Sequence, residues 1–282
     1  MSIGPIGKIL FSKYMPPAGI TLVLWDHCLT FDEEVTTIWS SFKGPILPKA
    51  IYVMNRYFTE AVLLYTVYVF ARLRQPTANK ASECASFFWL FSMSTTLFAG
   101  ILQFLVTLRA YRLWDYKQTM RRLLLAVFAA CMAGSVVLSV RMVVALTKES
   151  VLLSPEVILC AVPYVPKETP FLMGLLLLFN IFVISVSFYN ALEEPRRRER
   201  EVLISLRRHS AKVYFIVSFL WVVLLISSIY GEMLVHFPVL ILVWSVGANL
   251  TSRMHLRIES LGLSNVPHPT MMYSTPPSRI HE

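Results

Sequence analysis

Three ionisable side chains, Asp26, Arg56 and Glu60, stand within or at the edge of long apolar runs. A charged side chain at membrane depth costs several kcal/mol unless it is paired, so each is a candidate functional residue. We expect Asp26 to pair with Arg56, because neighbouring antiparallel helices would hold them at comparable depth. Glu60 follows Arg56 by one helical turn, a spacing that lets it share the same cation. The expected chemistry is either charge pairing that fixes helix packing, or a response to a proton or ligand, for which Glu60 is the best candidate.

A second candidate set lies toward the opposite, outer side of the membrane. Glu232 and His236 are one turn apart at the start of the last apolar run, and Arg141 stands near the outer end of an earlier one. The three residues are placed to line an outward-facing cavity. The alternatives are that Glu232 and His236 simply lie at the interface and that Arg141 extends its side chain to the lipid headgroups.

The four cysteines separate by their expected depth. Cys84 and Cys160 fall on the outer, oxidising side, whereas Cys28 lies near the cytoplasmic interface and Cys131 in mid-membrane. We therefore expect a disulfide between Cys84 and Cys160 that tethers the longest outer loop. The alternative is two unpaired thiols.

Several kinds of catalytic or cofactor site are not indicated. No lysine follows Lys212, so the last helix offers no Schiff-base residue for retinal. His27 and His236 are expected at opposite ends of the bundle, which argues against a metal centre built on facing helices. No Gly-rich phosphate loop and no GxSxG nucleophile motif is present. We expect a protein without catalytic residues, metal or cofactor.

The elements that position these residues follow from composition and hydropathy. The chain has 56% hydrophobic and only 15% charged residues, and a bilayer-spanning helix needs roughly 20 mainly apolar residues. An all-α bundle of seven transmembrane helices over residues 1–262 is predicted, its spans covering approximately residues 14–28, 50–71, 85–108, 122–146, 170–192, 211–229 and 232–250. The first span is the weakest, because Pro16 and Pro17 open it; a re-entrant or interfacial segment is the alternative.

The distribution of basic residues predicts the orientation. Most of the 26 Lys and Arg residues, including the run Arg196–Arg198, fall in segments that are cytoplasmic if the N-terminus is outside and the C-terminus inside. The net charge of +9 is therefore topological and does not indicate nucleic-acid binding. These basic inner loops are solvated faces near anionic headgroups or, alternatively, a docking site for a cytoplasmic partner.

Two segments outside the spans carry helix signals. Thr30 and Glu33 have capping-box spacing, which predicts a short interfacial helix that begins there, between the first two spans. An apolar stripe from Leu250 to Leu261 predicts a second such helix after the last span. Residues 263–282 are rich in Pro and Ser and are expected to form a disordered cytoplasmic tail.

Particular motifs carry a resemblance to a known family. Asp26-His27, the helix from Asp32 to Trp39, Asn55-Arg56-Tyr57 and, more loosely, Ser252 to Glu259 resemble signatures of a large group of fungal multi-pass membrane proteins of basidiomycete type. Trp25 stands where that group usually has tyrosine, and Arg257 and Glu259 are displaced from its usual adjacent pair. The resemblance implies seven spans and no activity, since the group is of unknown function.

The leading functional hypothesis is a receptor-like, non-enzymatic protein of the plasma membrane or another secretory-pathway membrane. Its surroundings are the lipid bilayer, and its ligand is not indicated by any motif. One alternative is a small transporter or channel that uses Asp26, Arg56 and Glu60 as a polar track. Another is a membrane scaffold without a small ligand. A transporter requires a polar path continuous from both faces, whereas a receptor requires an outward pocket closed below.

Overall fold

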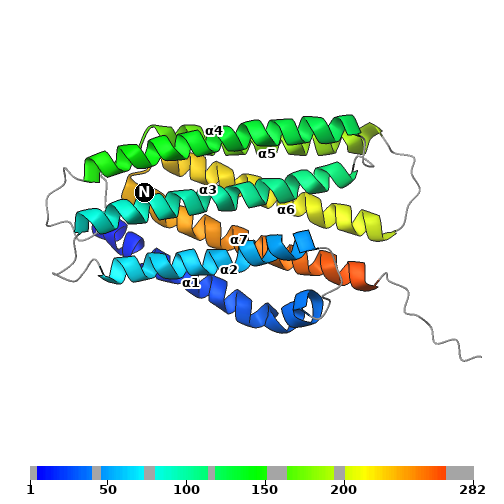
Figure 1. The fold of residues 1–282 in the computed structure, drawn as a ribbon, viewed down its shortest axis with the longest axis horizontal. Helices are drawn as coiled ribbons and strands as arrows, with labels where there is room; N and C mark the ends of the chain where they lie inside the picture. The colour runs from blue at the N-terminus through cyan, green and yellow to red at the C-terminus, as the bar shows by residue number, and fades with distance from the viewer. Residues whose placement is uncertain are drawn as a thin grey trace, which may run out of the picture.

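The computed structural model describes residues 5–39, 46–72, 80–113, 118–150, 164–193 and 201–264. These residues form seven α-helices and one short π-helical turn, and none of them is in a strand (Figure 1). In chain order the elements are α1 (Pro5–Glu34), η1 (Val35–Trp39), α2 (Ile46–Arg72), α3 (Lys80–Leu113), α4 (Gln118–Ser150), α5 (Glu168–Glu193), α6 (Glu201–Tyr230) and α7 (Met233–Ser264).

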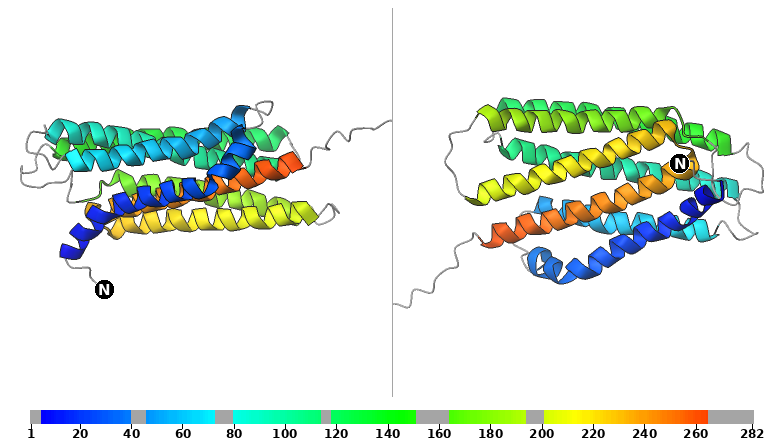
Figure 2. Two further views of the ribbon diagram at one scale, coloured as in Figure 1. Left: turned by 90° about the horizontal axis from the view of Figure 1, so that it is seen from below. Right: turned by 180° about the vertical axis from the view of Figure 1, so that it is seen from behind.

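The helices lie side by side, and successive helices run in opposite directions (Figures 1 and 2). Each helix packs against its neighbours in the chain, and α7 closes the arrangement by packing along α1 and α2. The apolar part of α3 is the most enclosed, with 67% of its residues buried, whereas only 22% of the corresponding part of α4 is buried. The bundle therefore has α3 inside and α4 at its periphery.

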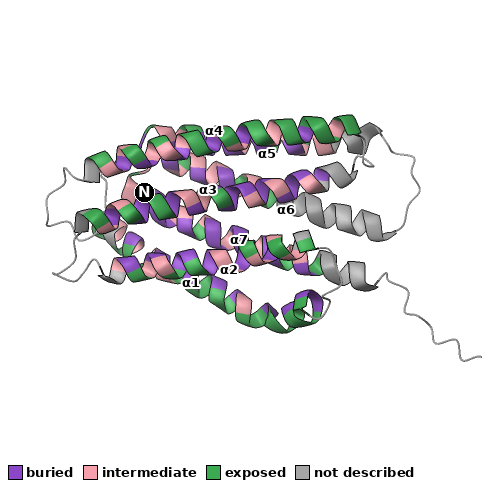
Figure 3. Ribbon diagram, in the orientation of Figure 1, coloured by how far each residue is buried: buried purple, intermediate pink, exposed green. Residues whose placement is uncertain are grey.

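Within the part of the chain that the structure describes, four helices are long and apolar enough to cross a bilayer: Ser82–Leu108, Gln118–Lys148, Glu168–Ser187 and Met233–Arg257. A shorter apolar stretch, Phe215–Tyr230, lies in α6. Large apolar side chains such as Phe171 and Phe215 are more than two-thirds exposed, and exposed positions run along the outer side of α4 (Figure 3). A bundle with this outer surface is suited to lipid, because soluble domains rarely leave extended apolar surface in water. α1 and α2, which carry the ionisable cluster described below, are not among the four.

The expected helix start at Thr30 is wrong. α1 continues without a break from Pro5 through Pro16 and Pro17 to Glu34, and the Thr30 hydroxyl donates to the Asp26 carbonyl oxygen at 2.8 Å. An amide within a continuous helix already has a backbone partner, so a capping box is not needed there. Instead of a separate interfacial helix, η1 extends α1 by one widened turn.

The second interfacial helix is also part of a longer element. The apolar stripe after residue 250 belongs to α7, which runs unbroken to Ser264. Of the expected tail, residues 263–264 belong to this helix, and residues 265–282 lie outside the described part of the chain.

α1 approaches α7 closely at Gly19. A Cβ atom at this position would lie 2.8 Å from Ile241 Cγ2 and 2.9 Å from Ser245 Oγ, so only a residue without a side chain fits the observed packing. Small residues allow transmembrane helices to pack at short range. Gly19 therefore sets the distance at which side chains of α1 and α7 meet further along both helices.

Candidate functional site

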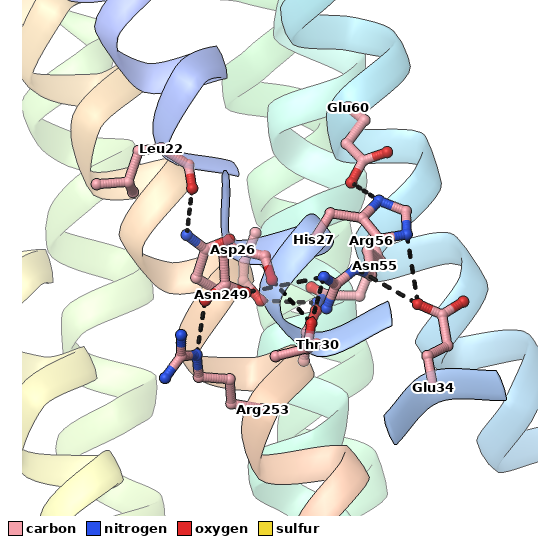
Figure 4. A network of polar contacts seen from close by, with 12 residues as sticks. Leu22, Asp26, His27, Thr30, Glu34, Asn55, Arg56, Glu60, Asn249 and Arg253 are labelled. Carbon is pink, nitrogen blue, oxygen red and sulfur yellow. Dashed lines mark hydrogen bonds and ion pairs between the residues drawn. The ribbon is translucent and has the colours of Figure 1, made fainter. Parts of the chain in front are cut away.

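Ionisable and polar side chains of α1, α2 and α7 converge in one cluster toward the C-terminal ends of α1 and α7 (Figure 4). On α1, Asp26, Thr30 and Glu34 recur at intervals of four residues, so they lie along one face of the helix. On α2, Arg56 and Glu60 are spaced in the same way. Of these side chains, those of Arg56 and Glu34 are the most buried, at 3% and 0% exposed.

Asp26 joins α1 to both other helices. Its Oδ1 accepts a hydrogen bond from Arg253 Nε of α7 at 2.6 Å, and its Oδ2 lies 3.9 Å from Arg56 Nη2 of α2. Arg56 Nη2 also donates to the Thr30 hydroxyl at 2.6 Å. The carboxylate of Asp26 is 8% exposed while Arg253 is 53% exposed, so Arg253 is the member of this set that reaches the surface of the described structure.

Glu34 is the most heavily hydrogen-bonded carboxylate of the cluster. It accepts hydrogen bonds from the hydroxyls of Tyr52 and Tyr57, at 2.9 and 2.6 Å, and from Trp39 Nε1 at 2.9 Å. Arg56 Nε lies 3.6 Å from its Oε2. Burial raises the pKa of Glu34, but the three donated hydrogen bonds and the Arg56 charge outweigh burial and hold the pKa below its ordinary value. Glu34 is therefore ionised at neutral pH.

His27 lies between two carboxylates. Its Nδ1 is 2.5 Å from Glu60 Oε1, and its Nε2 is 3.5 Å from Glu34 Oε2 (Figure 4). The ring of Tyr57 stands edge-on to the imidazole, with centroids 5.3 Å apart. His27 of α1 thus contacts α2 through the carboxylate of Glu60.

Neutral hydrogen bonds complete the connection to α7. The Asn55 amide nitrogen donates to the carbonyl oxygen of Ala248 at 3.1 Å and to the Ser252 hydroxyl at 3.0 Å. The Asn249 amide donates to the carbonyl oxygen of Leu22 at 3.3 Å. Each pair among α1, α2 and α7 is therefore joined by at least one polar contact.

The charges of the cluster do not balance if His27 is neutral, because three carboxylates face two guanidinium groups. Within the described residues, Arg56 Nε and Nη1, Asp26 Oδ2 and His27 Nε2 have no hydrogen-bond partner. Arg56 Nε and His27 Nε2 lie within ion-pair distance of Glu34, and Asp26 Oδ2 lies within ion-pair distance of Arg56. A buried group that is only partly paired is costly, so the cluster is sensitive to any change in charge. No set of three or more His, Cys, Asp or Glu side chains in the described residues is arranged to hold a metal ion.

The structure brings Asp26 and Arg56 into one site, but the position of Glu60 differs from the expectation. Glu60 contacts His27, whereas Arg56 turns toward Thr30, Asp26 and Glu34.

Sequence reasoning missed three members of the cluster: His27, Glu34 and Arg253. His27 and Glu34 are seven residues apart and so share a helix face, a signal that the assumed helix start at Thr30 obscured. Arg253 is one of the basic residues whose distribution predicts the orientation, and no sequence signal links it to Asp26. The motifs Asp26-His27, Asn55-Arg56-Tyr57 and Ser252-Arg253, far apart in the chain, all contribute to the cluster.

The outer candidates do not share one environment. Glu232 accepts a hydrogen bond from Lys8 Nζ at 2.7 Å, and His236 is buried with its Nδ1 2.9 Å from the Ser227 hydroxyl. Arg141 is exposed. Arg141 is thus exposed and His236 buried, so the outer-cavity set stays a prediction.

The cysteines are described only in part. Cys28 and Cys131 are free, and Cys84 is disulfide-bonded. Cys160 lies outside the described residues, so its pairing with Cys84 stays a prediction.

A cavity of about 50 Å³ lies between α3, α4, α5, α6 and α7. Its lining is mainly apolar and includes Trp221 and Trp244, with Thr96 and Ser135 among the few polar side chains. This volume suffices for only a few water molecules. None of the ionisable cluster residues lines it, so it is separate from the cluster.

Comparison with known proteins finds a family-model match over part of the chain. Residues 14–59 match the model of a family described as a family of unknown function (DUF6533). The matched range contains the α1 part of the cluster and Arg56, and it ends just before Glu60 and well before Arg253. No curated protein and no solved structure matches the chain. Because the function of this family is unknown, the match assigns no activity to the cluster.

Proposed function

We propose that this chain is a receptor-like, non-enzymatic membrane protein with seven spans, an outer N-terminus and a cytoplasmic C-terminus. In this proposal the cluster of α1, α2 and α7 is an ionic lock that holds the cytoplasmic ends of these helices in one arrangement. The seven described helices alternate in direction, which supports an odd number of spans if each of them crosses the membrane, and the resemblance to the fungal multi-pass family supports the same number. The membrane would be the plasma membrane or another membrane of the secretory pathway.

One observation carries the proposal: the contact between Arg253 of α7 and Asp26 of α1, at 2.6 Å, joins residues 227 positions apart. Arg253 is half-exposed, whereas Asp26 and Arg56 behind it are buried. A change in the position of α7 would separate Arg253 from Asp26 and leave a buried carboxylate with only its 3.9 Å contact to Arg56. The Arg253–Asp26 contact is suited to switch between two states, because breaking it leaves a buried carboxylate only partly paired, which is energetically unfavourable.

The basic inner segments extend this proposal to a partner. Arg121 and Arg122 are exposed at the start of α4. That end of α4 lies on the same side of the bundle as the C-terminal ends of α1 and α7 (Figure 1). We propose that this cytoplasmic side docks a partner when α7 moves. A Cys84–Cys160 disulfide would meanwhile keep the outer loop tethered over the bundle.

A transporter is the second candidate, favoured by the position of His27 between Glu34 and Glu60. Side chains that exchange protons are common on transport pathways through membranes. Against transport stands the cavity among α3–α7, which is small, mainly apolar and separate from the ionisable cluster. The described structure thus offers no polar track that joins the two features.

Hydrogen–deuterium exchange by mass spectrometry on the protein in lipid nanodiscs tests the lock. The variant Arg253→Gln should accelerate exchange at the C-terminal end of α7 and in the second half of α1, and should leave α3 to α5 unchanged. The matched control Arg141→Gln removes an exposed arginine from α4. If Arg253→Gln exchanged like the control, the lock would be refuted.

A flux assay separates the two candidate functions. Proteoliposomes that contain a trapped pH indicator and a pH gradient should hold the gradient as well as protein-free liposomes do. Faster proton flux with the wild-type chain, abolished in Glu60→Gln, would replace the receptor-like proposal with the transporter. A third outcome would favour a scaffold: the lock is intact, and variants of the cluster capture the same cytoplasmic proteins as the wild type.

A further inference from the structure

The imidazole of His27 is hydrogen-bonded to a carboxylate at Nδ1, whereas Nε2 lies within ion-pair distance of a second carboxylate and has no hydrogen-bond partner among the described residues. Glu60 of α2 lies 2.5 Å from Nδ1, and Glu34 of α1 lies 3.5 Å from Nε2. The three side chains are 15%, 11% and 0% exposed for His27, Glu60 and Glu34. An imidazole in this position is shielded from bulk water and has negative charge on both sides.

Hydrogen-bond chemistry limits the protonation states that suit this geometry. A neutral imidazole has one N–H donor and one nitrogen lone pair, whereas the protonated ring has two donors. In a neutral ring that donates to Glu60, the lone pair of Nε2 would face the anionic oxygen of Glu34. Nε2 can present an N–H toward Glu34 while Nδ1 stays hydrogen-bonded to Glu60 only if the His27–Glu60 pair holds one additional proton. That proton resides either on the ring, as imidazolium, or on the Glu60 carboxyl, which then donates to Nδ1 while Nε2–H faces Glu34.

The charged and titratable groups around the pair sum to zero charge when Asp26 and Glu34 are ionised, so an unprotonated His27–Glu60 pair leaves the cluster with a net charge of −1. They come from every element packed against it: Asp26 and Glu34 of α1, Trp39 of η1 through its bond to Glu34, Arg56 and Tyr57 of α2, and Arg253 of α7 through Asp26. The donors to Glu34 keep that carboxylate ionised, which leaves His27 and Glu60 as the pair that holds the proton. With the proton on the His27 ring, three carboxylates face three cationic groups. With the proton on Glu60, two carboxylates face two cationic groups.

We propose that His27 and Glu60 form a proton-binding site that takes up one proton per chain from the aqueous phase at the C-terminal end of α1. Uptake changes the net charge of the cluster from −1 to zero, with no other bond made or broken. Release leaves one buried negative charge without a counter-charge and weakens the contact between α1 and α2. The two residues that share the proton belong to α1 and α2, so the protonation state of His27 can be tested whether or not Arg253 acts as a lock.

Solid-state NMR on the protein in lipid bilayers at neutral pH tests the site directly. Asp26-His27 is the one Asp-His pair in the chain, so labelling aspartate carbonyl carbons and histidine nitrogens identifies His27 without a substitution. We expect either two protonated ring nitrogens at His27, or a protonated Nε2 together with a protonated carboxyl signal that is lost in Glu60→Gln. A neutral His27 ring with both Glu34 and Glu60 ionised would overturn the proposal.

Variants give an independent readout. Glu60→Gln should convert His27 from the doubly protonated to the neutral ring at the same pH if the proton is on imidazolium. His236→Gln is the matched control, because His236 is a buried histidine that contacts a serine hydroxyl. It should leave the His27 signals unchanged. A His27 spectrum that stayed the same in Glu60→Gln, with no carboxyl signal lost, would contradict a shared proton.

Discussion

Arg56 is the residue on which most of the buried charge in the cluster depends. Its guanidinium lies within ion-pair distance of both Asp26 and Glu34 and donates to Thr30. Arginine suits this position because its planar group offers five N–H donors and stays charged. The loss of Arg56 would remove a cation from two buried carboxylates, Asp26 and Glu34.

Replacing Arg56 with glutamine is therefore expected to lower the free energy of unfolding by about 3–5 kcal/mol, the usual cost of removing one partner from a buried ion pair. Denaturant-induced unfolding in mixed micelles measures the change. Arg141→Gln should stay within about 0.5 kcal/mol of the wild type, because that side chain is exposed. Equal effects of the two substitutions would mean that the Arg56 contacts are energetically unimportant.

Glu34 predicts how stability depends on pH. Because its folded-state pKa is lower than in the unfolded chain, the stability it contributes is fully present above the unfolded pKa. That contribution is lost as the pH falls from the ordinary glutamate value, about 4.3, through the lower folded value. Melting temperatures between about pH 7 and pH 3 should fall more steeply for the wild type than for Glu34→Gln. Parallel curves for the two proteins would argue against a lowered pKa.

At the scale of elements, the close packing of α1 on α7 positions Asp26 opposite Arg253. Gly19 permits this approach, two turns before Asp26 on the same helix. Pro16 and Pro17 lie just before it, where the sequence suggested a weak start of the first span. The structure instead continues α1 through both prolines, which transmembrane helices tolerate when neighbouring groups satisfy the freed backbone.

Substituting Gly19 with alanine should destabilise the protein by about 1–3 kcal/mol, because the added methyl group overlaps Ile241 and Ser245. Thermal unfolding in detergent provides the measurement. Gly174→Ala serves as the control, since a Cβ at Gly174 meets nothing within 4 Å. A Gly19→Ala protein as stable as the control would show that α1 and α7 can separate slightly without cost.

At the scale of the whole molecule, the proposed seven spans place the two chain ends on opposite sides of the membrane. Reporters fused at residue 1 and at residue 282 should therefore report different compartments, the first outside and the second in the cytoplasm. The physical reason is the excess of basic residues in alternate connecting segments. Two reporters in the same compartment would require an even number of spans.

The outer tether is a separate prediction for the whole molecule. Mass spectrometry of the protein digested without reductant should recover a peptide that links Cys84 to Cys160. Cys28 and Cys131 should be alkylated in the same sample, because both are free thiols. Recovery of alkylated Cys160 would contradict the tether.

The sequence by itself determined the class of the protein, since hydropathy is a local property: four of the predicted spans coincide with apolar helices of the structure. It also identified Asp26, Arg56 and Glu60, because a charged residue within or beside an apolar run can be recognised from the sequence without knowledge of its partner. Which groups meet was decided only by the tertiary structure. The partner of a side chain depends on the rotation and depth of neighbouring helices, and these follow from packing contacts such as Gly19 on Ile241. For that reason Glu60 meets His27, and Asp26 finds a second cation 227 residues further along the chain.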